Sequence, residues 1–139
     1  MILRLKTLMI AASAKVLKER NMGMATDAAH IEIHLDPGLL DLVNLRLVQI
    51  HGCELSVQNQ ILKLKERGSN DHRMYLVHDW RRQTIFNLRE KAALNLTEAL
   101  ACNPIYAVPD EAVRAVRLFF SETEMICLFQ VILAVNDWP

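Results

Sequence analysis

Apolar residues recur at three- and four-residue steps along most of this chain, and this spacing constrains the fold more than any other feature. Such steps place apolar side chains on one face of an α-helix, which must then pack against another element. Glycine and proline, which interrupt helices, each occur only four times in 139 residues. The pattern therefore predicts an all-α protein of about seven helices.

Capping residues and breaks divide the pattern into separate helices. Acceptor side chains precede several apolar runs, and two of them, Asn87-x-x-Glu90 and Ser121-x-x-Glu124, have the spacing of a capping box. One alternating run, residues 29–35, has no partner strand in the sequence, so we expect a loop or a helical turn there. The expected helices span about residues 2–20, 36–50, 53–67, 70–80, 87–103, 109–120 and 121–138.

Length and charge limit the class of protein. The chain is long enough for one domain, which we expect to cover residues 1–139. Sixteen basic and sixteen acidic residues give no net charge, which argues against nucleic-acid or anionic-membrane partners. The hydrophobic content is 52% and the mean hydropathy is +0.12. Because a small domain has little interior, we expect part of this apolar surface to lie between subunits of a homo-oligomer.

Three cysteines at wide spacing fit neither a disulfide framework nor a zinc site, and they favour a reducing cytoplasm. Cys102 and Cys127 lie in apolar helical stretches, where buried thiols are expected. No cofactor or metal is expected, because His30 and His34 lack a third ligand at supporting spacing. The N-terminal stretch resembles a signal peptide in outline, but its apolar segment is short and Lys6 interrupts it, so we expect an amphipathic helix.

The most informative segment runs from Asp41 to Gln60, with the sequence DLVNLRLVQIHGCELSVQNQ. Further landmarks follow in order at residues 80–81, 86, 89–94, 108–111, 120–121 and 134–138. Over about residues 35–138 this arrangement resembles the carboxymuconolactone decarboxylase and alkylhydroperoxidase D-like family. In that family an acid-Leu-Val helix leads into Cys-x-x-Cys-x-x-x-His. The resemblance implies an orthogonal bundle of about six to seven helices and a homo-oligomer, commonly a trimer or hexamer.

The resemblance also implies a thiol-dependent peroxidase or disulfide reductase with an antioxidant role, but several motif positions differ here. Cys53 keeps the first thiol, whereas Ser56 stands at the second cysteine and Gln60 at the histidine. Asp41 stands at the position of the upstream glutamate. In the family the second cysteine is the one expected to attack peroxide, and serine neither ionises near neutral pH nor forms a disulfide. We therefore expect peroxidase turnover to be weak or lost.

Cys53 can still be reactive, because a cysteine just after a helix joint lies near free backbone N–H groups that favour its thiolate. His51, two residues earlier, is a candidate for tuning that thiol.

Three interpretations remain open. The chain can be a non-catalytic oligomer that binds a small molecule or partner. It can be a monothiol redox protein that uses Cys53 with an external thiol, unless Cys53 is buried and inert. It can be a lactone decarboxylase, although Gln60 in place of the histidine argues against proton transfer.

Overall fold

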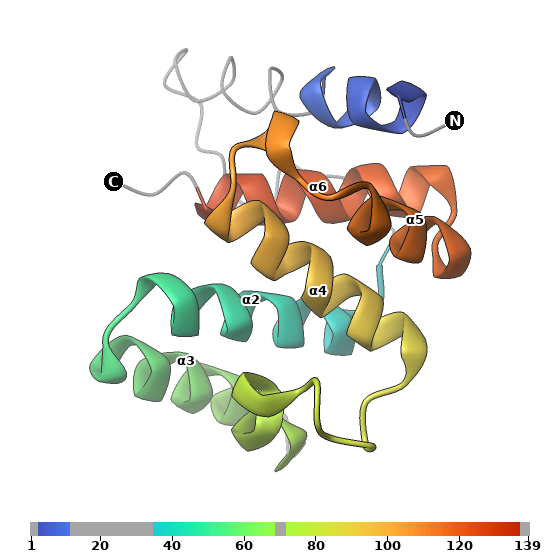
Figure 1. Cartoon of the computed structure of the whole chain (residues 1–139). Helices are drawn as coiled ribbons and strands as arrows, with labels where there is room; N and C mark the ends of the chain where they lie inside the picture. Colours follow the sequence, from blue (N-terminus) through green and yellow to red (C-terminus); the bar gives the residue numbers. More distant parts are fainter. Residues whose placement is uncertain (1–2, 12–34, 69–71, 137–139) are drawn as a thin grey trace.

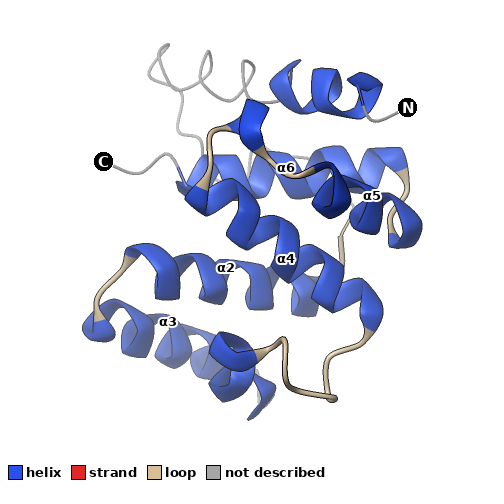
Figure 2. Cartoon of the chain, viewed as in Figure 1, coloured by secondary structure: helices blue, strands red, loops and turns tan. Residues whose placement is uncertain are grey.

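The computed structural model describes residues 3–11, 35–68 and 72–136, and every regular element in these ranges is helical (Figures 1 and 2). No strand occurs within them. The all-α prediction is therefore confirmed. The elements are a helix at 3–11, α2 (Pro37–His51), α3 (Glu54–Glu66), the 3-10 helix η2 (His72–Asp79), α4 (Leu88–Cys102), the 3-10 turn η3 (Ile105–Ala107), α5 (Asp110–Phe119) and α6 (Glu122–Asn136).

The helices begin and end where the capping residues predict. The backbone N–H of Leu39 donates to Asp36 Oδ2 at 3.0 Å at the start of α2. Asn87 and Glu90 form a reciprocal capping box, since each backbone N–H donates to the other's side chain at 2.9 and 2.8 Å. Gly68 follows α3 with φ of +87°, a conformation that favours glycine. These local signals explain why the sequence locates most helix boundaries.

Residues 72–79 form a 3-10 helix rather than the α-helix expected over about 70–80. Met74, Val77 and Trp80 are spaced by three residues and are all buried. A helix with three residues per turn places such side chains on one face, which an α-helix would rotate apart. Burial of this triplet therefore accounts for the tighter helix. The turn η3 was not expected from the sequence.

Some expected elements fall partly outside the described residues. Only positions 3–11 of the helix expected over 2–20 are described, and the run at 29–35 lies outside except for its last residue. The last helix is described as far as Asn136.

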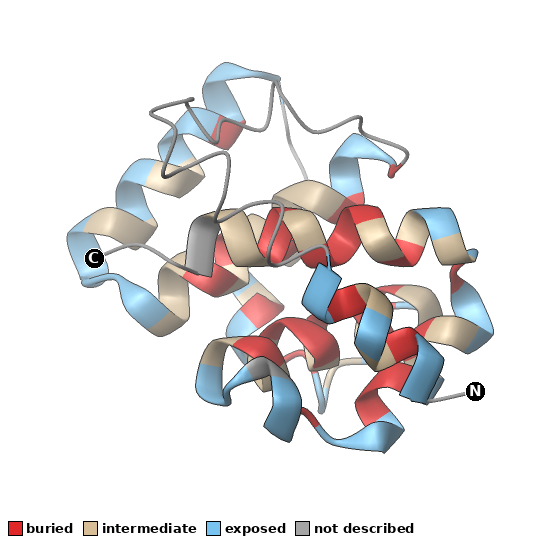
Figure 3. Cartoon of the chain, turned by 90° about the horizontal axis from the view of Figure 1, so that it is seen from above, coloured by how far each residue is buried: buried red, intermediate tan, exposed pale blue. Residues whose placement is uncertain are grey.

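α2 is the central helix of the bundle, between α3 on one side and α6 on the other (Figure 1). Its residues Leu39, Val43 and Leu47 belong to a first hydrophobic cluster shared with α4, α5, α6 and the helix at 3–11. Leu42 and Leu45 belong to a second cluster shared with α3, η2 and α4. Buried residues accordingly gather through the middle of the molecule, with exposed residues on the outer turns (Figure 3).

A polar network beside the second cluster joins α2, α4 and the end of η2. Glu98 on α4 accepts hydrogen bonds from Arg46 Nε at 3.0 Å, from Trp80 Nε1 at 2.8 Å and from Arg81 at 2.9 Å. Burial opposes ionisation of Glu98, but the hydrogen bonds and the Arg46 charge outweigh it and hold the pKa of this carboxyl below its ordinary value. The network fixes η2 against the two central helices.

Replacing Leu45 by alanine tests the importance of α2 in the second cluster. Leu45 is fully buried, so Leu45→Ala should lower the free energy of unfolding by about 2–5 kcal/mol in a urea titration. Leu88→Ala makes the same chemical change on α4 at a side chain that is 67% exposed. It should change stability by less than about 0.5 kcal/mol. Equal effects of the two variants would contradict this description of the core.

Candidate functional site

The joint between α2 (Pro37–His51) and α3 (Glu54–Glu66) is a tight turn of two residues, Gly52 and Cys53. The backbone N–H of Gly52 donates to the Val48 carbonyl at 2.7 Å, which closes the end of α2. A Cβ atom at position 52 would lie 2.6 Å from the Val48 oxygen and 2.9 Å from Ser56 Cβ. Only glycine fits without a shift of backbone, and this close approach brings Cys53 to the first turn of α3.

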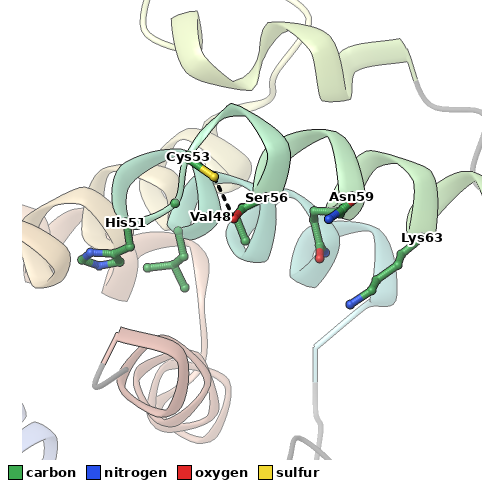
Figure 4. A pocket seen from close by; sticks show the side chains of 9 residues that line it. Val48, His51, Cys53, Ser56, Asn59 and Lys63 are labelled. Carbon is green, nitrogen blue, oxygen red and sulfur yellow. Dashed lines mark hydrogen bonds between the residues drawn. The ribbon is translucent and has the colours of Figure 1, made fainter. Parts of the chain in front are cut away.

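Cys53 is the N-cap residue of α3, and its side chain is exposed. Its Sγ lies 3.5 Å from Ser56 Oγ (Figure 4). The pKa of the Cys53 thiol is lowered, first by the Ser56 hydroxyl and then by the backbone N–H groups of Ser56 and Leu55, all of which favour the thiolate. The structure therefore shows an exposed rather than a buried Cys53.

A cavity of about 430 Å³ opens between α2 and α3 beside this thiol. Three of its lining residues come from α2, two from the joint and four from successive turns of α3 (Figure 4). No carboxylate is among the lining residues, and Lys63 is the lining residue with a permanent charge. The lining residues are Leu47, Val48, His51, Gly52, Cys53, Ser56, Asn59, Gln60 and Lys63.

Four of the five sequence-predicted site residues line this one cavity, namely His51, Cys53, Ser56 and Gln60. Asp41 does not. It lies ten residues before the end of α2, about 15 Å along the helix axis, and its Oδ1 pairs with Arg67 Nη2 at 2.8 Å. The carboxylate is thus engaged at the far end of the helix pair, away from the thiol.

Asn59 and Lys63 also line the cavity, and neither was predicted as a site residue from the sequence. Both continue the face of α3 that begins at Ser56, because steps of three, four and seven residues share one side of a helix. That spacing was available in the sequence. The missing information was that this face of α3 borders a cavity rather than open solvent.

The other two cysteines lie away from the cavity. Cys127 is buried, as expected. The expectation of a buried Cys102 is wrong, because it is the last residue of α4 and is exposed there before the chain turns at Pro104. Cys53 is therefore the one cysteine among the cavity's lining residues.

The other described histidines do not line the cavity. His72 and His78 are exposed on η2, whereas His30 and His34 lie outside the described residues. In the described ranges no group of three or more His, Cys, Asp or Glu side chains is arranged to hold a metal ion. None of the helices in those ranges has the length and apolar content needed to cross a membrane.

Comparisons with known proteins give both a family and a fold. The chain is 30% identical over 98 residues to the uncharacterized protein YdfG of Bacillus subtilis, across 70% of this chain and 67% of YdfG. It belongs to the same family as YdfG. It is also 34% identical over 80 residues to the uncharacterized protein YnjA of Escherichia coli, across 58% of this chain and 43% of YnjA. No family model matches the chain.

A crystal structure of a protein of unknown function from Agrobacterium tumefaciens matches with a TM-score of 0.67 and 22% sequence identity. The match covers 93% of this chain and 82% of that one, which is described as a candidate antioxidant defence protein AhpD. The alkylhydroperoxidase D-like fold that the sequence motifs implied is thereby confirmed.

The pH dependence of alkylation tests the environment of the Cys53 thiol. In a Cys102→Ser background, the rate of Cys53 labelling by iodoacetamide should rise with pH around a midpoint below that of an unperturbed cysteine thiol. Ser56→Ala should move that midpoint upward, since it removes the largest stabilisation of the thiolate. Gln58→Ala, at an exposed position of α3 outside the cavity, should leave it unchanged. An unchanged midpoint in Ser56→Ala would refute the assigned role of the hydroxyl.

Proposed function

We propose that this protein is a monothiol thiol–disulfide oxidoreductase on the alkylhydroperoxidase D-like scaffold, with Cys53 as its reactive group. The observation that carries the proposal is an exposed thiol of lowered pKa, at a helix N-terminus, in the wall of a cavity. A thiolate rather than a thiol is the nucleophile in disulfide exchange. This position combines a nucleophile with space for a small substrate.

The proposed reaction has two exchange steps. The Cys53 thiolate attacks one sulfur of a disulfide R–S–S–R, the S–S bond breaks, and the released RS⁻ takes a proton from solvent. The product is a mixed disulfide between Cys53 and RS. An external thiol R′SH then attacks the substrate sulfur as its thiolate, forms R–S–S–R′ and releases Cys53 as its thiolate, so that one RSH has been freed and the external thiol has been oxidised to a disulfide.

An external thiol is required because no second cysteine borders the cavity. Ser56 stands at the position of the motif's second cysteine, with its Oγ 3.5 Å from Cys53 Sγ, and its hydroxyl stabilises the Cys53 thiolate. Gln60 cannot exchange protons near neutral pH as an imidazole can. We therefore propose that dithiol-dependent peroxidase turnover is weak or lost. The non-catalytic binding interpretation does not explain why the single thiol in the cavity should be activated.

We also propose that the chain assembles with copies of itself. Large apolar side chains are exposed on α3 and at the end of α5, with Leu55, Leu62 and Leu118 at 63%, 56% and 79% exposure. Covering such leucines removes apolar surface from water, which is the main contribution to association of obligate oligomers. The relevant oligomer can be a trimer or a hexamer, as in the proteins whose motifs this sequence resembles.

Two turnover assays distinguish the monothiol reaction from the dithiol reaction. With reduced glutathione as the external thiol and hydroxyethyl disulfide as substrate, the natural protein should turn over, and Cys53→Ser should not. With an alkyl hydroperoxide and a dithiol reductant, the natural protein should show little turnover. Ser56→Cys combined with Gln60→His should raise the hydroperoxide rate about tenfold or more, because the second thiol, which attacks peroxide in the family motif, and a proton-transfer group are restored.

Cys102→Ser is the matched control, because it removes an exposed thiol outside the cavity. It should retain the activity with glutathione. Disulfide reduction that survives in Cys53→Ser, or robust hydroperoxide turnover by the natural protein with the dithiol, would overturn the proposed function.

A further inference from the structure

The lining of the cavity contains a positively charged side chain and no carboxylate, which affects the kind of substrate that it can bind. Its nine lining residues include Lys63 and His51 but no aspartate or glutamate. Among the described residues, none of the ion pairs involves Lys63. An ammonium group that borders a cavity without a carboxylate beside it attracts an anionic group of a bound molecule.

Lys63 lies at the opposite end of the cavity from Cys53. The two residues are ten positions apart on α3, which corresponds to about 15 Å along the helix axis. Side chains on a helix lean toward its N-terminus, and Figure 4 shows the Lys63 ammonium directed back along the cavity toward Asn59. The lean makes the separation between thiol and ammonium shorter than this axial spacing. The amide side chains of Asn59 and Gln60 lie between them.

From this arrangement we infer that the cavity selects thiols and disulfides that carry a carboxylate, with the carboxylate at Lys63 and the exchanging sulfur at Cys53. This inference rests on the proposed function. A peptide of two or three residues spans about 7–10 Å when extended, so a cysteine-containing tripeptide such as glutathione has the required reach. Asn59 and Gln60 supply donors and acceptors for its peptide groups. Lys63 is thus a specificity residue for the same site.

A series of small disulfides that differ in charge tests the inference. Dithiodipropionate is a dianion, hydroxyethyl disulfide is neutral and cystamine is a dication. The rate at which each forms a mixed disulfide with Cys53 is measured by intact mass in the natural protein and in Lys63→Gln. The natural protein should prefer the anion over the neutral disulfide, and Lys63→Gln should reduce that ratio about threefold to fivefold. The ratio of the two rates is the readout, because a general effect of the substitution on Cys53 reactivity cancels in it.

Two further variants sharpen the test. Lys63→Glu should favour cystamine over dithiodipropionate, because the charge at that end of the cavity is reversed. Lys65→Gln is the matched control, since Lys65 lies over the Tyr75 ring at 5.4 Å and does not line the cavity. It should leave the series unchanged. The anion preference of the natural protein should weaken in 1 M salt, where exposed charges are screened. If the ratio of the dithiodipropionate rate to the hydroxyethyl disulfide rate is the same in the natural protein and in Lys63→Gln, the inference is overturned.

A non-reactive probe separates this inference from the proposed function. S-methylglutathione has no exchangeable sulfur but keeps both carboxylates, so it should slow iodoacetamide labelling of Cys53 in the natural protein and not in Lys63→Gln. Protection without any disulfide exchange would refute the proposed function and leave the anion site standing. Exchange without charge preference or protection would refute the anion site alone. Absence of both would refute both.

Discussion

Burial of α2 on two opposite faces is the constraint on which the rest of the structure depends. One face packs Leu39, Val43 and Leu47 into the first cluster, and the other packs Leu42 and Leu45 into the second. A helix buried in this way cannot rotate or slide without exposing apolar side chains of one cluster or the other. The C-terminal end of α2 therefore has a fixed position, and this position determines where the Gly52–Cys53 turn begins.

The position of Cys53 depends mainly on the turn at Gly52, between α2 and α3. Gly52 lets α3 fold back so closely that a Cβ atom would collide with the Val48 carbonyl. The first turn of α3 therefore lies against the last turns of α2. Cys53 lies at the free backbone N–H groups of α3, and the cavity lies between the two helices. α3 itself contributes only Leu64 to the fully buried residues. Its outer face is thus available for contacts with other chains, and its inner face lines the cavity.

Much of the fold could be predicted from sequence because its signals are local. The capping residues Asp36, Asn87 and Ser121 act on helix ends within four residues, so their effect does not depend on distant parts of the chain. The 3-10 form of η2 was missed because it depends on burial of Met74, Val77 and Trp80 against other helices. Tertiary packing overrides local preference there.

Part of the candidate site could also be predicted, because the spacing of residues along one helix is a local signal. Motif spacing placed Cys53, Ser56 and Gln60 on one face of a helix, and they do share a cavity. The engagement of Asp41 with Arg67 could not be deduced, because it depends on how two helices pair at their far ends. The exposure of Cys102 was missed because helical periodicity does not indicate how completely the final turn is covered. The role of Lys63 as a cavity residue could not be predicted, because the sequence does not show which face of α3 borders the cavity.

We proposed that Cys53 is an accessible thiol of lowered pKa that forms mixed disulfides by exchange with small disulfides. Intact mass measurement after incubation with oxidised glutathione, followed by peptide mapping, tests it most directly. We expect a glutathione adduct on Cys53 that forms faster than any adduct on Cys102, that a dithiol removes, and that is absent from Cys53→Ser. Modification of Cys102 with Cys53 left unmodified would contradict it.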